Sequence, residues 1–180
     1  MLLDAQRSVL LIVDVQQALL PAMADSARVV RGASILMRAA LRLGIPVVVS
    51  QQYPKGLGPT APELAALAPA GSVVDKMHFS CAADAAVADR LRQPGRDQVV
   101  LAGIEAHVCV LQSALGLKEM GLAPFVAADA TCSRTEASHQ AAMARLAAAG
   151  VTVGTVEMAL FEWLHRAGTP EFKELSALIK

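Results

Sequence analysis

Residues 99–110 read VVLAGIEAHVCV, and the fold is most readily inferred from this stretch. An aliphatic run of the kind found in buried parallel strands leads into Gly103, and a helical pattern begins at Val108. Cys109 therefore lies where a strand passes into a helix. Unpaired N–H groups and the helix dipole at such a position favour a thiolate. A free cysteine is just as often a small core residue, so the partners of Cys109 decide its role.

Outward from this stretch, strand and helix patterns alternate along the chain. Strands are predicted at Ser8–Asp14, Ile45–Ser50, Val73–Lys76, Gln98–Gly103, Pro124–Ala128 and Val151–Thr155. Helices are predicted at Ser26–Leu43 with Ser26 as the cap, Cys81–Arg92 closed by Gln93-Pro94-Gly95, Val108–Met120, Glu136–Ala149, Glu157–Arg166 and Pro170–Ile179, with a turn at residues 131–134. This alternation builds right-handed βαβ units. We therefore expect one α/β domain over residues 1–180, with a parallel sheet between two layers of helices.

Three chemically active side chains follow or end predicted strands, namely Asp14, Lys76 and Cys109. Ligands of open parallel sheets bind beyond the carboxyl ends of the strands, where the strand order reverses. An acid or a lysine at a single strand end is usually a solvated surface residue. Together, the three residues supply a proton acceptor, a positive charge that lowers the thiol pKa, and a nucleophile.

The composition narrows the classes of partner and compartment. Apolar residues make up 54% of the 180 residues, and the 16 basic residues balance the 16 acidic ones, which gives no indication of binding to nucleic acid or to an anionic membrane. Three scattered cysteines fit neither a disulfide framework nor a structural zinc site, and they predict a reduced, cytoplasmic protein. The apolar run at residues 9–13 is too short for a signal peptide or a membrane span. No glycine-rich phosphate loop is present, so no nucleotide cofactor is expected.

The motifs that carry these residues resemble those of the isochorismatase-like cysteine hydrolases, over nearly the whole chain. They are Leu11-Ile12-Val13-Asp14-Val15-Gln16, Lys76 with Phe79-Ser80, and Gly103-Ile104-Glu105-Ala106-His107-Val108-Cys109-Val110. The loop at residues 52–58 and the segment at residues 170–174 resemble the branch of isochorismatase domain-containing proteins. Asp14, Lys76 and Cys109 fall on the catalytic triad of the family.

This resemblance implies several further features. The sheet order would be 3-2-1-4-5-6, and a cis peptide at Ile104–Glu105 would aim the N–H groups of Glu105 and Cys109 at one oxyanion. The substrate pocket would involve Gln16, Gln52, Tyr53, Ile104 and Val108. Nicotinamidases of this family carry metal-binding Asp and His residues where this chain has Gln52 and Pro54, so no metal or other cofactor is expected.

We therefore expect a metal-independent hydrolase of a small amide or related acyl compound, acting through a Cys109 thioester. The alternative is a protein that keeps the fold and binds a small molecule, or serves as a scaffold, without turnover. His107 is a rival base for Cys109, although residues two apart across such a turn usually point apart. The high apolar content and the family resemblance predict a homo-oligomer, with a small-molecule substrate as its other partner.

Overall fold

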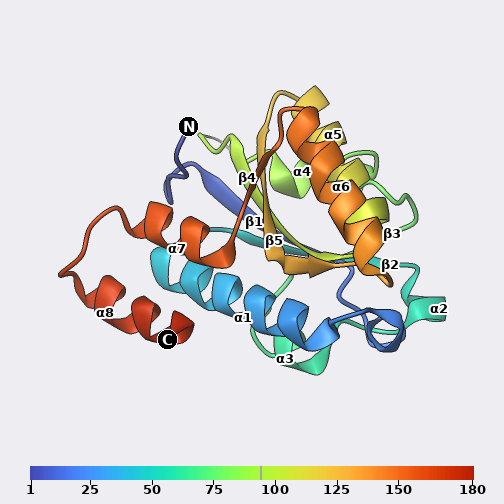
Figure 1. Cartoon of the computed structure of the whole chain (residues 1–180), viewed down its shortest axis with the longest axis horizontal. Coiled ribbons are helices and arrows are strands. Elements are labelled where there is room, and N and C mark those ends of the chain that lie inside the picture. The colour runs from blue at the N-terminus through green and yellow to red at the C-terminus, as the bar shows by residue number, and fades with distance from the viewer. Residues whose placement is uncertain (94) are drawn as a thin grey trace.

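Six parallel strands form one sheet in the order β3-β2-β1-β4-β5-β6 (Figure 1). The computed structural model describes residues 1–93 and 95–180. The strands are β1 (Ser8–Val13), β2 (Val47–Gln52), β3 (Val73–Lys76), β4 (Gln98–Ile104), β5 (Ala123–Cys132) and β6 (Thr152–Gly154). The predicted α/β class and the strand order 3-2-1-4-5-6 are confirmed.

Helices cover both faces of this sheet, as Figure 1 shows. One face carries α1 (Ser26–Leu43), α7 (Val156–Leu164) and α8 (Pro170–Ser176), and the other carries α4 (Ala85–Leu91), α5 (Leu111–Glu119) and α6 (Glu136–Ala148). The short helices α2 (Pro54–Leu57) and α3 (Pro62–Ala65) lie between β2 and β3. Two apolar cores result, one on each face. The predicted three-layer arrangement is therefore confirmed.

The central strands are buried on both faces. Every residue of β1 and of β4 is buried, which is why their sequences are continuous aliphatic runs rather than alternating ones. The edge strand β3 is different, because within it only Lys76 is buried. A buried lysine at the end of an exposed edge strand indicates that its ammonium is held inside the molecule.

The cap of α1 and the start of α4 differ from their predictions. α1 begins at Ser26 as predicted, but its cap is Asp25, whose Oδ1 accepts a hydrogen bond from the Arg28 N–H at 3.0 Å. α4 begins at Ala85 rather than Cys81, and the Cys81 N–H donates to Ser113 Oγ at 2.8 Å. Pro94, predicted to close this helix, lies outside the described residues.

β5 continues to Cys132, whereas the sequence predicts an end at Ala128 and a turn at residues 131–134. The pairing with β4 skips several residues of β5, since Leu101 pairs with Val126 and Gly103 pairs with Thr131. In this bulge, Asp129 accepts a hydrogen bond from the Val156 N–H at the start of α7, at 2.8 Å. The Asp129 carboxylate thus links β5 to α7. It lies within β5, whereas the sequence predicts that the strand ends just before it.

Gly103 brings β1 and β4 unusually close together near their carboxyl ends. Its φ is +127°, and a Cβ atom at this position would lie 2.1 Å from the Val13 carbonyl oxygen. Only glycine fits there, because any side chain would collide with the backbone of β1. Beyond this contact the chain order reverses from β1–β2–β3 to β4–β5–β6, so residues after β1 and after β4 share the crevice where ligands bind in such sheets.

Within the described part of the chain, no helix has the length and apolar character needed to cross a membrane.

We predict that Gly103→Ala lowers the free energy of unfolding by on the order of 3 kcal/mol, from backbone strain together with the clash against Val13. Gly121→Ala is the matched control, because Gly121 also has a positive φ of 82° but no neighbouring atom within 4 Å. That control should cost only about 1 kcal/mol. Urea unfolding measures both, and equal costs would contradict the close approach of β1 and β4.

Candidate active site

Asp14 follows β1 directly, and its backbone has a positive φ of 50°. Few residues with a side chain adopt this conformation, but aspartate is among those that tolerate it. The Asp14 side chain has no exposed surface. Its Oδ1 accepts a hydrogen bond from Ser50 Oγ at 2.7 Å, and its Oδ2 lies 2.7 Å from Lys76 Nζ. The sharp bend after β1 therefore turns a carboxylate into the interior, where it has two partners.

Lys76 reaches this carboxylate from the edge of the sheet. Because β3 lies two strands away from β1, at about 4.8 Å per strand, the side chain has to pass over the end of β2. Its Nζ lies 2.7 Å from both Asp14 Oδ2 and Gln52 Oε1, and it also donates to the carbonyl groups of His78 (3.0 Å) and Phe79 (3.2 Å). These four acceptors surround the ammonium and fix its position.

Cys109 lies in a wide helical turn, η2 (Ala106–Val110), that connects β4 to α5. The helical backbone therefore starts two residues earlier than the predicted start at Val108. The peptide bond between Ile104 and Glu105 is cis, and the Glu105 carbonyl accepts hydrogen bonds from the N–H groups of Val108 and Val110. Cys109 is 7% exposed, so its thiol lies just below the surface.

The predicted lowering of the Cys109 pKa is wrong in direction. Burial raises the pKa of this thiol well above its ordinary value, and the charge and acceptor oxygens of Asp14 raise it further. Lys76 acts in the predicted direction, but its effect is smaller than that of burial or of the Asp14 charge. The resting thiol is therefore protonated at neutral pH, within the electrostatic reach of Asp14.

A second thiol and a serine belong to the same cluster, and sequence reasoning missed both. Cys81 has no exposed surface, and its Sγ lies 3.5 Å from Ser50 Oγ. Burial, followed by the charge of Asp14, raises the pKa of Cys81 as well. Ser50 could have been found from the sequence, because it ends the predicted second strand much as Asp14 ends the first. Cys81 gave no such signal.

Gln16 and Gln52, which the resemblance places beside the substrate, use their side-chain amides in hydrogen bonds to buried groups. The Gln16 amide bonds the N–H and the carbonyl of Gln52 and also the carbonyl of Gly58. The Gln52 side chain accepts from Lys76 Nζ and donates to the Met77 carbonyl at 2.9 Å. With their amide groups occupied in this way, the two residues hold Lys76 and the loop after β2 in place.

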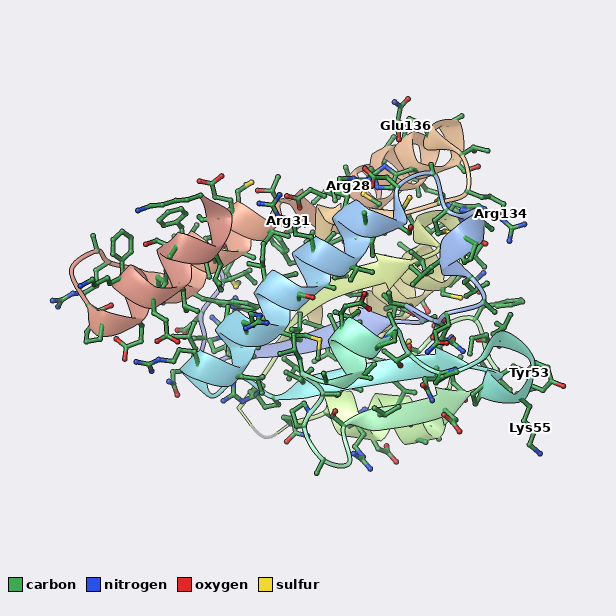
Figure 2. All side chains as sticks on the ribbon, turned by 90° about the horizontal axis from the view of Figure 1, so that it is seen from below. Arg28, Arg31, Tyr53, Lys55, Arg134 and Glu136 are labelled. Carbon is green, nitrogen blue, oxygen red and sulfur yellow. The ribbon has the colours of Figure 1, made fainter. Side chains whose placement is uncertain are left out.

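The other three expected pocket residues lie in different settings. Ile104 is fully buried in the core beneath α1, Val108 is half-buried in η2, and Tyr53 is 47% exposed. Figure 2 shows Tyr53, Lys55 and Arg134 near the carboxyl ends of the strands. Tyr53 and Lys55 project on one side, and Arg134 projects on the other. The rim of the site is therefore built from the loops after β2 and β5.

His107, the rival base, has its ring turned toward the loop after β5. Its Nδ1 lies 2.9 Å from Ser133 Oγ. Among the residues that the structure describes, no three side chains of the His, Cys, Asp or Glu type are grouped so that they could hold a metal ion.

Comparison with known proteins assigns the chain to a family. The family model for the isochorismatase domain matches residues 8–158 of the chain. The chain belongs to the isochorismatase domain family. Isochorismatase domain-containing protein 2 of Danio rerio is 36% identical over 179 residues, which cover 98% of this chain and 89% of that protein. The suggested branch of the family is thus confirmed.

Solved structures share this isochorismatase domain fold. The MAR1 ribonuclease of Caenorhabditis elegans matches with a TM-score of 0.93 at 33% identity, over 99% of this chain and 92% of that one. The YcaC gene product of Escherichia coli, an octameric hydrolase of unknown specificity, matches with a TM-score of 0.92 at 23% identity, over 99% of this chain and 90% of that one. At that identity the second likeness concerns the fold alone.

We predict that iodoacetamide alkylates Cys109 with a pH midpoint above the value of about 8.5 for a free thiol. Asp14→Asn should move the midpoint to lower pH, because it removes a negative charge beside the thiol and leaves Lys76 in place. Asp97→Asn is the control, since Asp97 pairs with Arg7 at the opposite end of the sheet and should leave the profile unchanged. A midpoint that rises or stays constant in Asp14→Asn would contradict this arrangement.

Proposed function

We propose that this isochorismatase domain is a metal-independent cysteine hydrolase of a small amide or related acyl compound. The observation that carries the proposal is the fully buried Asp14–Lys76 ion pair, 2.7 Å apart, next to the protonated thiol of Cys109. A carboxylate close enough to a protonated thiol to raise its pKa can serve as the general base for that nucleophile. The expected triad of Asp14, Lys76 and Cys109 thereby acquires a chemical role.

In the proposed reaction, Asp14 takes the thiol proton as Cys109 Sγ adds to the substrate carbonyl carbon. The carbonyl oxygen becomes an oxyanion, for which the N–H groups of Glu105 and Cys109 are the proposed donors. Collapse of this intermediate breaks the C–N bond, and the leaving amine takes the proton from Asp14. A water molecule then attacks the thioester while Asp14 takes its proton, which passes to Cys109 Sγ as the acid product leaves.

Lys76 has an electrostatic role in this scheme. Its ammonium balances the charge of Asp14 where neither side chain has exposed surface and an unpaired carboxylate is costly. By binding only Oδ2, it leaves Oδ1 to Ser50 and holds the carboxylate in one orientation. The carboxylate is therefore held in place before the substrate arrives.

Independence from metals follows from the chemistry at the two positions that replace metal-binding residues. The Gln52 amide is occupied by Lys76 and by the Met77 carbonyl, and the Pro54 side chain has no donor atom. Neither residue is a suitable ligand for a divalent ion. The reaction as proposed needs no Lewis acid, because the backbone N–H groups stabilise the oxyanion.

A small-molecule substrate in a reducing, cytoplasmic setting fits the remaining observations. The three cysteines are free, as is usual for proteins of such compartments. The ribonuclease name of the C. elegans neighbour raises RNA as a competing substrate, but zero net charge does not favour a polyphosphate ligand. Cleavage of RNA that is lost in Cys109→Ala would overturn the amide proposal, whereas cleavage that survives the substitution would point to a contaminant.

We also propose that the protein is a homo-oligomer. Three large apolar side chains are exposed around the rim, namely Tyr53 (47%), Met77 (66%) and Phe79 (55%), and exposed apolar groups that lie together usually mark an interface. The octameric state of the YcaC protein makes self-assembly the natural expectation on this fold. Light scattering at micromolar concentration should give a mass well above 18.8 kDa, and a mass near that value would contradict it.

The proposed function predicts a covalent adduct. Mass spectrometry of the protein quenched during reaction with activated amides should find the acyl group on Cys109, and Cys109→Ser should lower kcat/KM by about 10³-fold or more. Cys132→Ser is the matched control, since Cys132 is a buried thiol that lies outside the Asp14 cluster. EDTA should leave the rate unchanged.

An acyl group found only on Cys81 or Cys132 would contradict the proposal. Absence of any adduct and of any turnover, over a broad panel of amides and esters, would favour a non-catalytic binding protein instead.

A further inference from the structure

Two side-chain links connect the nucleophile turn to the loop that follows β5. The Glu105 carboxylate accepts hydrogen bonds from Arg134 Nε at 3.0 Å, from Arg134 Nη2 at 2.8 Å and from the Arg134 backbone N–H at 3.3 Å. His107 Nδ1 lies 2.9 Å from Ser133 Oγ. Ser133 and Arg134, which follow β5, therefore bind His107 and Glu105 in the turn that carries Cys109.

These links continue the sheet beyond its last backbone pair. The β4–β5 ladder ends where Ile104 pairs with Cys132. Glu105 and Ser133 are the next residues, Arg134 is the second after Cys132, and His107 is the third after Ile104. The loop after β5 is itself anchored, because the Ser133 carbonyl accepts a hydrogen bond from the Ala24 N–H at 3.1 Å. The nucleophile turn is thereby connected to the segment before α1 as well as to its own strand.

The Glu105–Arg134 pair has an unusual distribution of burial. The Glu105 side chain is 11% exposed, whereas that of Arg134 is 59% exposed. Burial, the largest influence, raises the pKa of Glu105, but the hydrogen bonds and the charge of Arg134 outweigh it, so the net pKa is lowered. A desolvated carboxylate whose three donors all come from one residue depends on that residue for its position.

We propose that the Glu105–Arg134 pair, together with the His107–Ser133 link, is a positioning device that holds the N–H groups of Glu105 and Cys109 toward one oxyanion. This inference rests on the proposed function. In it Arg134 is a positioning residue, since it acts through Glu105. The pair fixes the residue whose own N–H is a proposed donor, and the second link fixes the turn midway between Glu105 and Cys109.

The positioning role of Arg134 should affect acylation and alkylation of Cys109 differently. Acylation of Cys109 passes through a tetrahedral oxyanion and needs both N–H groups in place. Alkylation by iodoacetamide forms no oxyanion at a carbonyl, so it reports only the ionisation and access of the thiol. Displacement of a catalytic group by about 1 Å can lower a rate by about 10²-fold, so loosening the turn should affect acylation far more than alkylation.

The chain supplies a matched control at the opposite end of the same sheet. Arg7, just before β1, makes a two-point ion pair with Asp97, just before β4, through Nε at 2.9 Å and Nη2 at 2.5 Å. Arg7 joins the segments that precede the neighbouring strands β1 and β4, just as Arg134 joins the segments that follow β4 and β5. Arg7→Met therefore removes a two-point arginine–carboxylate pair, more exposed than Glu105–Arg134, without touching the nucleophile turn.

The test measures acylation by a chromogenic activated ester and alkylation by iodoacetamide, each quantified on Cys109 by mass spectrometry. In Arg134→Met we expect acylation to fall by about 10- to 100-fold while alkylation stays within about twofold of wild type. Arg134→Lys should restore part of the acylation rate, and Arg7→Met should leave both rates unchanged. Circular dichroism and thermal melting establish that each variant is folded.

Acylation that is unchanged in Arg134→Met, or that falls in parallel with alkylation, would overturn the positioning role. If Arg134→Met does not fold, Glu105→Gln provides the same comparison, because it removes the charge that holds the guanidinium and keeps the shape of the side chain. Acylation of the wild type at a residue other than Cys109 would overturn the proposed function itself, and the positioning role with it.

Discussion

The buried ion pair between Asp14 and Lys76 is the interaction on which the rest of the site depends. Removing two charges from water is costly, and attraction between them compensates only when their remaining hydrogen-bonding positions are filled. Here the Ser50 hydroxyl, the Gln52 amide and two backbone carbonyl groups fill them. Loss of either ionic partner should cost about 3–5 kcal/mol, because it leaves an uncompensated charge in the interior. The same contacts hold together the ends of β1, β2 and β3.

This pair also explains how a thiol with a raised pKa can be a nucleophile. Burial and the nearby negative charge keep Cys109 protonated at rest, so the site does not rely on a preformed thiolate. In the proposed mechanism, Asp14 accepts the thiol proton as the sulfur attacks. A protonated thiol at rest is also less prone to oxidation, since the thiolate is the reactive form.

The continuous aliphatic runs were sufficient to predict the strands and a parallel sheet, because strands buried on both faces lack alternation. The strand order and the grouping of Asp14, Lys76 and Cys109 were implied by the family resemblance, since aliphatic runs alone do not fix which strands are neighbours. The direction of the Cys109 pKa could not be predicted, since it depends on how deeply the thiol is buried and on its distance from Asp14. The inward orientation of Gln16 and Gln52 could not be predicted either, because both follow predicted strands, and polar residues in loops usually face solvent. Nor could the Glu105–Arg134 pair be predicted. Its two residues are 29 apart in sequence, and the bulge in β5 that lies between them has no recognisable sequence pattern.

The most direct test of this account is a double-mutant cycle between Asp14 and Lys76, measured as the acylation rate of Cys109. Asp14→Asn removes the base, and Lys76→Met leaves that base buried without its charge partner, so each should lower the rate by about 10²-fold or more. If Lys76 acts through Asp14, the double variant should be no slower than the slower single variant. Losses that multiply in the double variant would show that the two residues act independently and would contradict the account.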